Sequence, residues 1–365
     1  MAELVKTTSE NSLDRNWAFK CIDDIKNYHV ESLEGYTLDY NKGISIIMDR
    51  ASTDDYSEIQ SLSQKEVVKL ILALEGDSIQ RKIKFASLYK IPYRYALYSE
   101  KECHYVWVYK FQDTKGLLER EFTSYEEFGD WLNNKRSLSI SKNFGHNTST
   151  IKGTSKFSKL PIFDQALRNN GTPWLANLDG IIFNDNNDPI ALLEMQTTYK
   201  ISPKNHDNNK YYLQGQDINR FDIIEVASIQ SGLPWFIITW SPLPDHREDY
   251  VIKKVNHIAH PYTNIIDGKS DISRDYMNLL KRFSYYSDTN DKKKIKIEEE
   301  ICSKQKSFLL KKQGDQISKE LFESSLSINN GSFPNIYYDY IYEGNSKTSF
   351  ISDMNKILEG LTSPC

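Results

Sequence analysis

The sequence predicts an α/β protein in which helices flank a mixed central sheet. Short apolar runs typical of buried strands recur along the chain. Segments with apolar residues at helical spacing lie between them, and clusters of turn-forming residues separate the two kinds of segment. With 365 residues, 39% of them hydrophobic and 26% charged, the chain can bury a sizeable core, and its length indicates two or three domains.

The first predicted domain is an N-terminal α/β unit over residues 1–130. β-branched and aromatic runs predict strands at residues 43–48 (GISIIM), 93–98 (YRYALY) and 105–111 (YVWVYKF). Helical spacing predicts helices at residues 64–74, 79–88 and 123–132, the last of which begins with a capping-box-like TSYEE. None of these segments carries a residue pattern that indicates a chemical reaction.

The second predicted domain covers residues 161–365 and begins with an antiparallel hairpin. Its strands are expected at residues 178–184 (LDGIIFN) and 189–198 (PIALLEMQTT), joined by the turn cluster NDNNDP. A long helix is expected over residues 207–231 and a buried strand over residues 233–240 (LPWFIITW). The helix then forms a crossover that returns the chain parallel to the hairpin.

A helical C-terminal extension is expected to complete the second domain. A further strand is predicted at residues 250–255, helices at 273–283 and 293–312, and an edge strand at 336–342 (IYYDYIY).

Residues 131–160, between the two domains, are predicted to form a basic loop or linker. No acidic residue occurs between Asp130 and Asp164, and the interval is rich in Ser and Thr. Cations and small hydroxyl donors suit phosphate contacts, although a plain interdomain linker has the same composition. The lysines expected to contact DNA are Lys152, Lys156 and Lys159.

The overall composition excludes several classes of protein. Mean hydropathy is −0.59 and no run approaches the 18 apolar residues of a membrane span, so we expect no membrane insertion. The four cysteines lie far apart and form no CxxC pair, which is typical of reduced thiols and predicts a cytoplasmic protein. The net charge of −4 excludes a uniformly basic surface but leaves room for a local basic face.

Two carboxylates on the predicted hairpin carry the chemistry. Asp179 lies near the start of the first strand, and Glu194 lies on the second strand two residues before Gln196. Strand alternation puts Glu194 and Gln196 on one face. Carboxylates that converge from paired strands are hard oxygen ligands for Mg²⁺, which keeps several waters and completes its shell with a phosphate.

This arrangement resembles the PD-(D/E)XK nucleases, the superfamily with the restriction-endonuclease-like fold. The resemblance covers residues 160–257 and rests on Leu178-Asp179, Glu194-Met195-Gln196, the following helix and the LPWFIITW strand. It implies that Asp179 and Glu194 bind Mg²⁺, for which Mn²⁺ can substitute, and that Gln196 touches the attacking water and the scissile phosphate. Gln196 replaces the usual lysine, so another cation must offset charge, and Lys200 and Lys210 are the candidates.

Further residues around the hairpin are candidates for DNA contact. The polar stretch that leaves the second strand can meet phosphates or base edges, although simple solvent exposure explains it equally well. Its candidate residues are His206, Asn208, Asn209 and Arg220. Asp164, on a helix expected just before the hairpin, is either a further acidic site residue or a charge favoured by the helix dipole.

The N-terminal domain repeats parts of this pattern. Leu38-Asp39 precedes an apolar strand that ends at Asp49, and a helix then leads to IPYRYALY. The pattern suggests a duplicated or degenerate nuclease-like domain. Because Ala51 follows Asp49 at the position of Gln196, we expect this part to bind or scaffold rather than cut.

The resemblance therefore implies a Mg²⁺-dependent endonuclease of the type II restriction kind, which hydrolyses phosphodiester bonds in double-stranded DNA. The expected partners are the DNA duplex, a second copy of the chain in a homodimer or higher oligomer, and a cognate DNA methyltransferase of the same system. Two alternatives remain open at this point. One is a phage-defence or repair nuclease controlled by a partner, and the other is a catalytically inactive nuclease-fold protein that binds DNA.

Overall fold

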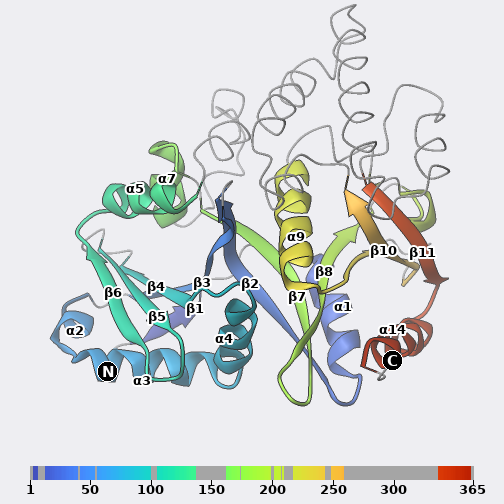
Figure 1. The fold of residues 1–365 in the computed structure, drawn as a ribbon, viewed down its shortest axis with the longest axis horizontal. Coiled ribbons are helices and arrows are strands. Elements are labelled where there is room, and N and C mark those ends of the chain that lie inside the picture. The colour runs from blue at the N-terminus through green and yellow to red at the C-terminus, as the bar shows by residue number, and fades with distance from the viewer. Residues whose placement is uncertain are drawn as a thin grey trace, which may run out of the picture.

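The computed structural model describes residues 3–6, 13–39, 42–53, 56–99, 105–136, 162–172, 174–198, 201–206, 208, 217–242, 248–258 and 336–362. These residues build one mixed sheet of eleven strands with helices on both faces (Figure 1). The α/β class that the sequence predicts is confirmed.

The strands follow the order β11-β10-β9-β8-β7-β2-β3-β4-β5-β6, with β1 paired to β3. They are β1 (Leu4–Lys6), β2 (Tyr28–Asp39), β3 (Gly43–Thr53), β4 (Tyr93–Ser99), β5 (Val106–Phe111), β6 (Leu117–Phe122), β7 (Ala176–Asn184), β8 (Pro189–Thr197), β9 (Trp235–Trp240), β10 (Tyr250–Ile258) and β11 (Ile336–Gly344). The helices are α1 (Leu13–Asp23), α2 (Tyr56–Ser61), α3 (Gln64–Glu75), α4 (Ser78–Leu88), α5 (Tyr125–Lys135), α7 (Ile162–Asn169), α9 (Asp217–Ser231) and α14 (Lys347–Thr362), with a 3₁₀ turn η2 (Pro203–Asn205).

The two halves of the chain repeat one order of elements. The N-terminal half, α1 to α5, contains a helix, the β2–β3 hairpin, a helical crossover through α3 and α4, the strand β4 parallel to β3, the antiparallel strands β5 and β6, and a final helix. The C-terminal half, α7 to α14, repeats this order with β7, β8, α9, β9, β10 and β11. The crossover that returns parallel to the second hairpin strand, as the sequence predicts, is therefore present in both halves.

Strand pairing between β2 and β7 places a pseudo-twofold axis at the centre of the sheet. The two strands are antiparallel, and Leu33 pairs with Leu178. On one side of this pair Glu31 faces Ile181, and on the other side Tyr36 faces Ala176. Exchanging the two halves about Leu33 and Leu178 converts one of these pairs into the other, so the register itself has twofold symmetry.

Glycines beside the axis permit the close approach of strands in both hairpins. Gly35 pairs with Met48 and Gly180 pairs with Leu193. A Cβ atom on Gly35 would lie 3.1 Å from the Met48 carbonyl oxygen, and one on Gly180 would lie 3.1 Å from the Leu193 Cβ. A side chain at either position would therefore require its neighbours to shift by a few tenths of an ångström.

The first helix of each half reaches the strands of the other half, and α1 contacts β2 of its own half as well as β8. Helix α1 contributes Ala18 and Ile22 to a core with Met195 of β8 and Phe350 of α14. Helix α7 packs beside α5 over the N-terminal strands, where Phe163 stacks on Tyr98 with ring centroids 4.2 Å apart. Figure 1 shows the α5/α7 pair at one end of the sheet and the α1/α14 pair at the other.

Helices α3, α4 and α9 cover the opposite face of the sheet. Their apolar residues form one large core with alternate residues of the central strands, among them Ile47, Leu192 and Ile237. Helix α9 ends at Ser231, and Gly232 follows with φ +72°, the left-handed conformation that often terminates helices. The expected end of this helix at Gly232 is confirmed.

Most of the predicted elements are present, with differences at their ends. The hairpin β7–β8, the strands β3, β4, β5, β9 and β10, and the helices α3, α4 and α5 are confirmed, as is the edge position of β11. Helix α5 runs to Lys135, five residues into the expected loop 131–160, because Trp131 and Leu132 are buried in the core. The helices expected at residues 273–283 and 293–312 lie outside the described residues. In the part of the chain that the structure describes, no helix is long and apolar enough to cross a membrane.

Candidate functional site

The β7–β8 hairpin brings Asp179 onto the backbone of the strand that carries Glu194. The Asp179 Oδ2 atom accepts a hydrogen bond of 2.9 Å from the Met195 backbone N–H, and Oδ1 accepts one of 3.1 Å from the Asn177 side chain. Met195 is the residue between Glu194 and Gln196. The three positions singled out in the sequence therefore meet at one point of the hairpin.

Glu194 and Gln196 lie on the sheet face that α3, α4 and α9 cover. Met195 between them packs in the α1/α14 core on the opposite face, as strand alternation requires. The Glu194 side chain is fully buried and Gln196 is 9% exposed. Burying a carboxylate costs free energy of folding unless polar or charged groups lie beside it. The cost of burying Glu194 therefore depends on the polar groups around this part of β8.

A chain of hydrogen bonds runs from Gln196 to a buried cation. The Asn208 Nδ2 atom donates to Gln196 Oε1 over 2.5 Å, and Lys253 Nζ donates to Asn208 Oδ1 over 2.6 Å. Lys253 Nζ also donates to the His206 carbonyl over 2.8 Å. Lys253 and Asn208 are both fully buried, so this network lies inside the protein rather than on its surface.

Aromatic rings of the edge strand complete the surroundings of Lys253. Its Nζ atom lies 4.9 Å from the ring centroid of Tyr338 and 5.3 Å from that of Tyr340, both on β11. Cation–π attraction at such distances stabilises an ammonium group. On β10, Lys253 pairs with Ile237 of β9, which in turn pairs with Glu194, so the lysine and the glutamate share one row of the sheet.

The N-terminal half holds a different set of groups at the related place. Lys82 of α4 is fully buried, and its Nζ forms ion pairs with Asp49 and, at 3.2 Å, with Glu75. The hydroxyl of Tyr93 donates to Asp49 over 2.9 Å, and that of Tyr95 donates to Glu75 over 3.0 Å. An ammonium group therefore lies between the two buried carboxylates of this half.

The charges of this cluster are mutually stabilised. Burial alone would raise the pKa of Asp49, but the nearby Lys82 and Lys6 hold that pKa below its usual value. Burial alone would lower the pKa of Lys82, but the attraction of Asp49 and Glu75 outweighs it and raises that pKa. Asp49 and Lys82 are therefore both charged at neutral pH.

The register of the two hairpins corrects the parallel drawn from the sequence. Because Gly35–Met48 corresponds to Gly180–Leu193, Glu34 is the counterpart of Asp179. The expected match of Leu38-Asp39 with Leu178-Asp179 is wrong by five residues, since Asp39 lies at the end of β2, opposite Gly43. The match of Asp49 with Glu194 agrees with the register, because these residues face Tyr95 and Ile237 on the parallel strands.

Asp164 lies away from the hairpin carboxylates. Its carboxylate accepts two hydrogen bonds from Arg50, at 2.7 and 3.1 Å, and the Arg50 guanidinium lies 4.3 Å from the Trp174 ring centroid. Arg50 neighbours Asp49 on β3 and alternates to the opposite face of the sheet. Asp164 therefore fastens α7 to the N-terminal half rather than joining the site.

Other residues expected at the site are only partly described. Asn208 is buried in the network above. The backbone of His206 accepts a hydrogen bond from Lys253 and donates one to the Pro203 carbonyl. Arg220 lies in α9, but the structure does not describe its side chain. The expected residues outside the described part of the chain are Lys200, Lys210, Asn209, Lys152, Lys156 and Lys159.

Lys253 is the site residue that the sequence analysis missed. It lies in the run YVIKKV, and two adjacent lysines on one strand must point to opposite faces. Lys254 is exposed and Lys253 is buried. The inward position of one lysine could thus have been inferred once the strand was recognised as an inner one.

The donor set of the hairpin fits Mg²⁺ rather than a structural zinc site. Among the described residues, no group of three or more His, Cys, Asp or Glu side chains is arranged to hold a metal ion. Asp179 and Glu194 offer oxygen donors from two adjacent strands. Mg²⁺ is usually held by one or two carboxylates while water and substrate phosphates complete its shell, so a pair is sufficient.

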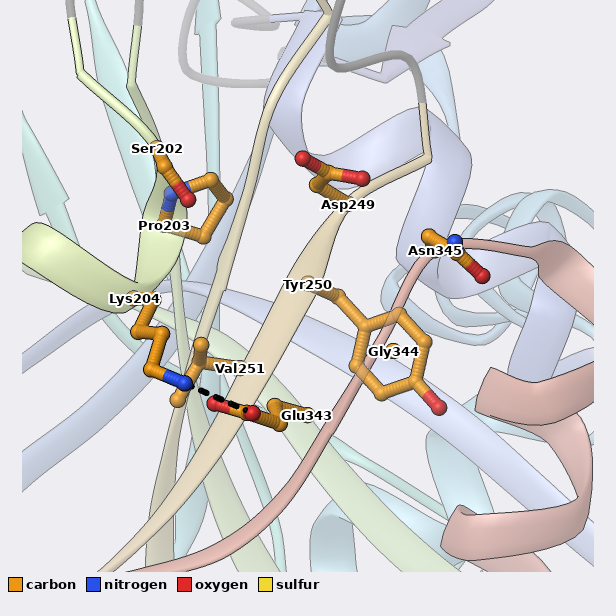
Figure 2. Close-up of a pocket in the computed structure, with 9 residues that line it drawn as sticks. All are labelled: Ser202, Pro203, Lys204, Asp249, Tyr250, Val251, Glu343, Gly344 and Asn345. Carbon is orange, nitrogen blue, oxygen red and sulfur yellow. Dashed lines mark hydrogen bonds and ion pairs between the residues drawn. The ribbon is translucent and has the colours of Figure 1, made fainter.

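A pocket of about 330 Å³ lies elsewhere in the C-terminal half, between η2 and the paired ends of β10 and β11 (Figure 2). Pro203, Tyr250 and Gly344 line it, and Lys204 pairs across it with Glu343 at 2.9 Å. None of Asp179, Glu194 and Gln196 lines this pocket, so its shape does not bear on the hairpin site.

Comparisons with known proteins assign this chain to no family. No family model matches the chain, and no curated protein matches it. Among solved structures, the crystal structure of the sex pheromone staph-cAM373 precursor is similar over 69% of this chain and 80% of that chain, with 11% identity and a TM-score of 0.18. A likeness at that score carries no argument about fold or function. The structure thus defines an α/β protein with a large mixed sheet flanked by helices.

Proposed function

We propose that the protein is a Mg²⁺-dependent endonuclease that hydrolyses phosphodiester bonds in double-stranded DNA at the β7–β8 hairpin, in a restriction-endonuclease-like core. One observation carries the proposal. The Asp179 carboxylate accepts a hydrogen bond from the backbone N–H of Met195, so the three residues of the D…ExQ pattern are neighbours on the hairpin. The parallel crossover from β8 through α9 to β9 supports it, because the resemblance implies this order of elements.

Each site residue has a role in this proposal. Asp179 and Glu194 hold Mg²⁺, which when bound lowers the pKa of a coordinated water and offsets charge on the phosphate. Gln196 orients the attacking water and donates a hydrogen bond to the scissile phosphate. The buried position of these groups strengthens their electrostatic effect, because little water screens them.

We assign the N-terminal half a supporting role. Its counterpart of Gln196 is Ala51, which has no polar group to offer a phosphate. Its carboxylates already surround the Lys82 ammonium, which takes the place that a divalent cation would need. One chain then supplies one cutting site, and cutting both DNA strands needs two chains, which agrees with the expected homodimer.

A second candidate function is favoured by the complete burial of Glu194. A metal ligand must reach a bound ion and its water, and a glutamate without exposure is equally consistent with a carboxylate that only stabilises the sheet. The protein would then bind DNA through a nuclease-like fold without cutting it.

Cleavage of phage or plasmid DNA by the purified full chain in Mg²⁺ separates the two candidates. We expect discrete fragments from the wild type and a loss of at least about 10²-fold in rate for Asp179→Asn and for Glu194→Gln. The matched control is Glu34→Gln, the counterpart of Asp179 in the other half, which should cut normally. Binding without cutting, in Mg²⁺ and in Mn²⁺, would establish the second candidate. Normal cutting by Asp179→Asn would remove the hairpin as the site.

A further inference from the structure

The hydrogen bonds behind Gln196 have a fixed direction. A lysine ammonium group has three donors and no acceptor, so the Asn208 atom that faces Lys253 must be the carbonyl oxygen Oδ1. The amide nitrogen of Asn208 then faces Gln196, and Gln196 must present its oxygen Oε1 to it. The orientation of a side-chain amide is often ambiguous, but here the cation at the end of the chain determines both.

This direction decides what Gln196 offers on its other side. With Oε1 engaged by Asn208 at 2.5 Å, the amide group directs its Nε2 atom, with two N–H donors, away from Asn208. A phosphate oxygen needs donors, and an exposed Oε1 would repel it. The motif lysine is absent at position 196, and among the described residues Lys253 lies two hydrogen bonds behind Gln196.

We propose that Lys253 and Asn208 are positioning residues that hold Gln196 with its N–H donors toward the scissile phosphate. The positive charge polarises the Asn208 amide, which in turn polarises that of Gln196, so the last donor is stronger than an isolated amide. We name Lys253, Asn208 and Gln196 the amide relay. This inference rests on the proposed function, and its ligand is the phosphodiester of the substrate DNA.

Burial makes the relay rigid. Lys253 and Asn208 are inaccessible to solvent, and the His206 carbonyl and the rings of Tyr338 and Tyr340 occupy further sides of the ammonium group. Flipping either amide would place a donor against a donor or an acceptor against an acceptor inside the protein, which costs the full desolvation of both groups. Gln196 therefore keeps one orientation without substrate.

The variant Asn208→Asp reverses the relay with almost no change of shape. An aspartate accepts from Lys253 but has no donor for Gln196, so the Gln196 amide turns its nitrogen inward and presents Oε1 to the phosphate. We expect kcat to fall by about 10²-fold while KM changes little, because the lost interaction is one that stabilises the transition state. Lys253→Arg, which keeps the charge, should lose less than Lys253→Met.

The double variant Asn208→Asp with Gln196→Lys tests the direction of the relay. A lysine at position 196 has only hydrogen-bond donors, so it donates to the phosphate regardless of the residue at position 208. The 10²-fold loss caused by Asn208→Asp should therefore shrink to within a few-fold in this background. An equal loss in both backgrounds, with unchanged thermal stability, would overturn the relay and leave Asn208 as a structural residue.

A measurement without cleavage keeps the proposal distinct from the proposed function. In the wild type without DNA, the Lys253 ammonium protons should be protected from exchange and visible by ¹H–¹⁵N NMR, and Asn208→Ala should abolish that signal. If the NMR signal is present in the wild type and lost in Asn208→Ala, but the wild type cuts no DNA, the proposed function fails. The hydrogen-bonded relay then exists but has no role in cleavage. If the wild type cuts DNA and Asn208→Asp cuts equally well, the relay fails alone.

Discussion

Replacing Lys82 with methionine should destabilise the protein strongly. Methionine has a similar volume and length, so the change removes the charge and leaves packing nearly intact. The ammonium group is fully buried and pairs with Asp49 and Glu75, which are also buried. After the substitution Asp49 loses its ion pair with Lys82 and stays in the core, while Glu75 keeps its ion pair with the partly exposed Lys6 at 2.9 Å.

The size of the effect follows from the burial of all three groups. Removing one partner of a buried ion pair costs roughly 3–5 kcal/mol, because an uncompensated charge stays inside the protein. With an unfolding entropy of about 2.1 cal/mol/K per residue, a chain of this length loses about 1.3 °C of melting temperature per kcal/mol. We therefore expect a decrease in melting temperature of about 4–7 °C.

Lys84 provides the matched control on the same helix. It pairs with Asp188, and both side chains are more than two-fifths exposed. Exposed ion pairs contribute about 0–1 kcal/mol, so Lys84→Met should shift the melting temperature by little more than 1 °C. Thermal unfolding followed by circular dichroism measures both variants. A Lys82→Met protein as stable as Lys84→Met would refute the reasoning.

The effect of Lys82→Met should depend on pH in a defined direction. Lys82 holds the pKa of Asp49 below its usual value in the folded state, so the stability from this carboxylate is present above the unfolded pKa of about 3.9 and is lost as the pH falls through the folded pKa. The pKa of Lys82 is raised, so its stability is present below about pH 10.4 and is lost as the pH rises through the folded value. In the variant, burial no longer opposed by Lys82 raises the pKa of Asp49, so the variant takes up a proton at a higher pH than the wild type. The difference in stability between wild type and variant should therefore be largest near neutral to mildly alkaline pH and shrink as the pH falls. A difference that grows on acidification would contradict this assignment.

Three further predictions concern Gln196, the Arg50–Asp164 ion pair and the basic loop. Gln196→Ala should impair cleavage severely, whereas Gln196→Lys should stay at least partly active, and steady-state kinetics on one DNA substrate compares the two. Arg50→Met should lower the free energy of unfolding by roughly 3–5 kcal/mol in chemical denaturation, with recovery in the double variant that also carries Asp164→Asn. Neutralising three lysines of the basic loop together should reduce the slope of log Kd against log salt by roughly 0.9 per lost phosphate contact, and an unchanged slope would make the segment a plain linker. These lysines are Lys152, Lys156 and Lys159.

Local patterns were enough to predict the hairpin and the crossover. The turn cluster NDNNDP and the apolar strands on either side of it specify β7 and β8 without help from distant residues. The same holds for β4, β5 and β9, which are rich in apolar and aromatic residues and are buried along almost their whole length because both faces are covered. The hairpin also brings Asp179 next to the backbone of Met195, the residue that follows Glu194.

The central strand β2 escaped prediction because its burial depends on a partner far along the chain. Its sequence, YHVESLEGYTLD, contains polar residues at several positions and shows no clean alternation. The strand becomes buried only when β7 pairs with it, and Glu34 is then almost fully covered. The sequence also does not show that α1 and α7 each pack against strands of the other half, because the apolar face of a helix does not specify which strands will cover it.

Buried charges were the other group that the sequence could not reveal. Lys82 stands in the run RKIKF, where three cations look alike, and only the position of Asp49 decides which one enters the core. Asn208 was expected at a DNA surface because its neighbours are polar, but its amide lies between Gln196 and Lys253. Such pairs join residues that are far apart in sequence, and no local pattern records them.

Because α1 and α7 each pack against strands of the other half, the chain cannot complete the folding of its N-terminal half during synthesis of that half. Helix α1 is synthesised first, but the strands β8, β9 and β10 that cover its apolar residues Ala18 and Ile22 emerge only after the whole N-terminal half has been made. The N-terminal sheet in turn waits for Phe163 and Leu167 of α7. A chain interrupted after Arg136 would therefore expose the apolar residues of α1 that β8, β9 and β10 cover, and the part of the sheet face beside α5 that α7 covers. The two fragments made together in one cell should assemble, while either fragment made alone should aggregate or be degraded.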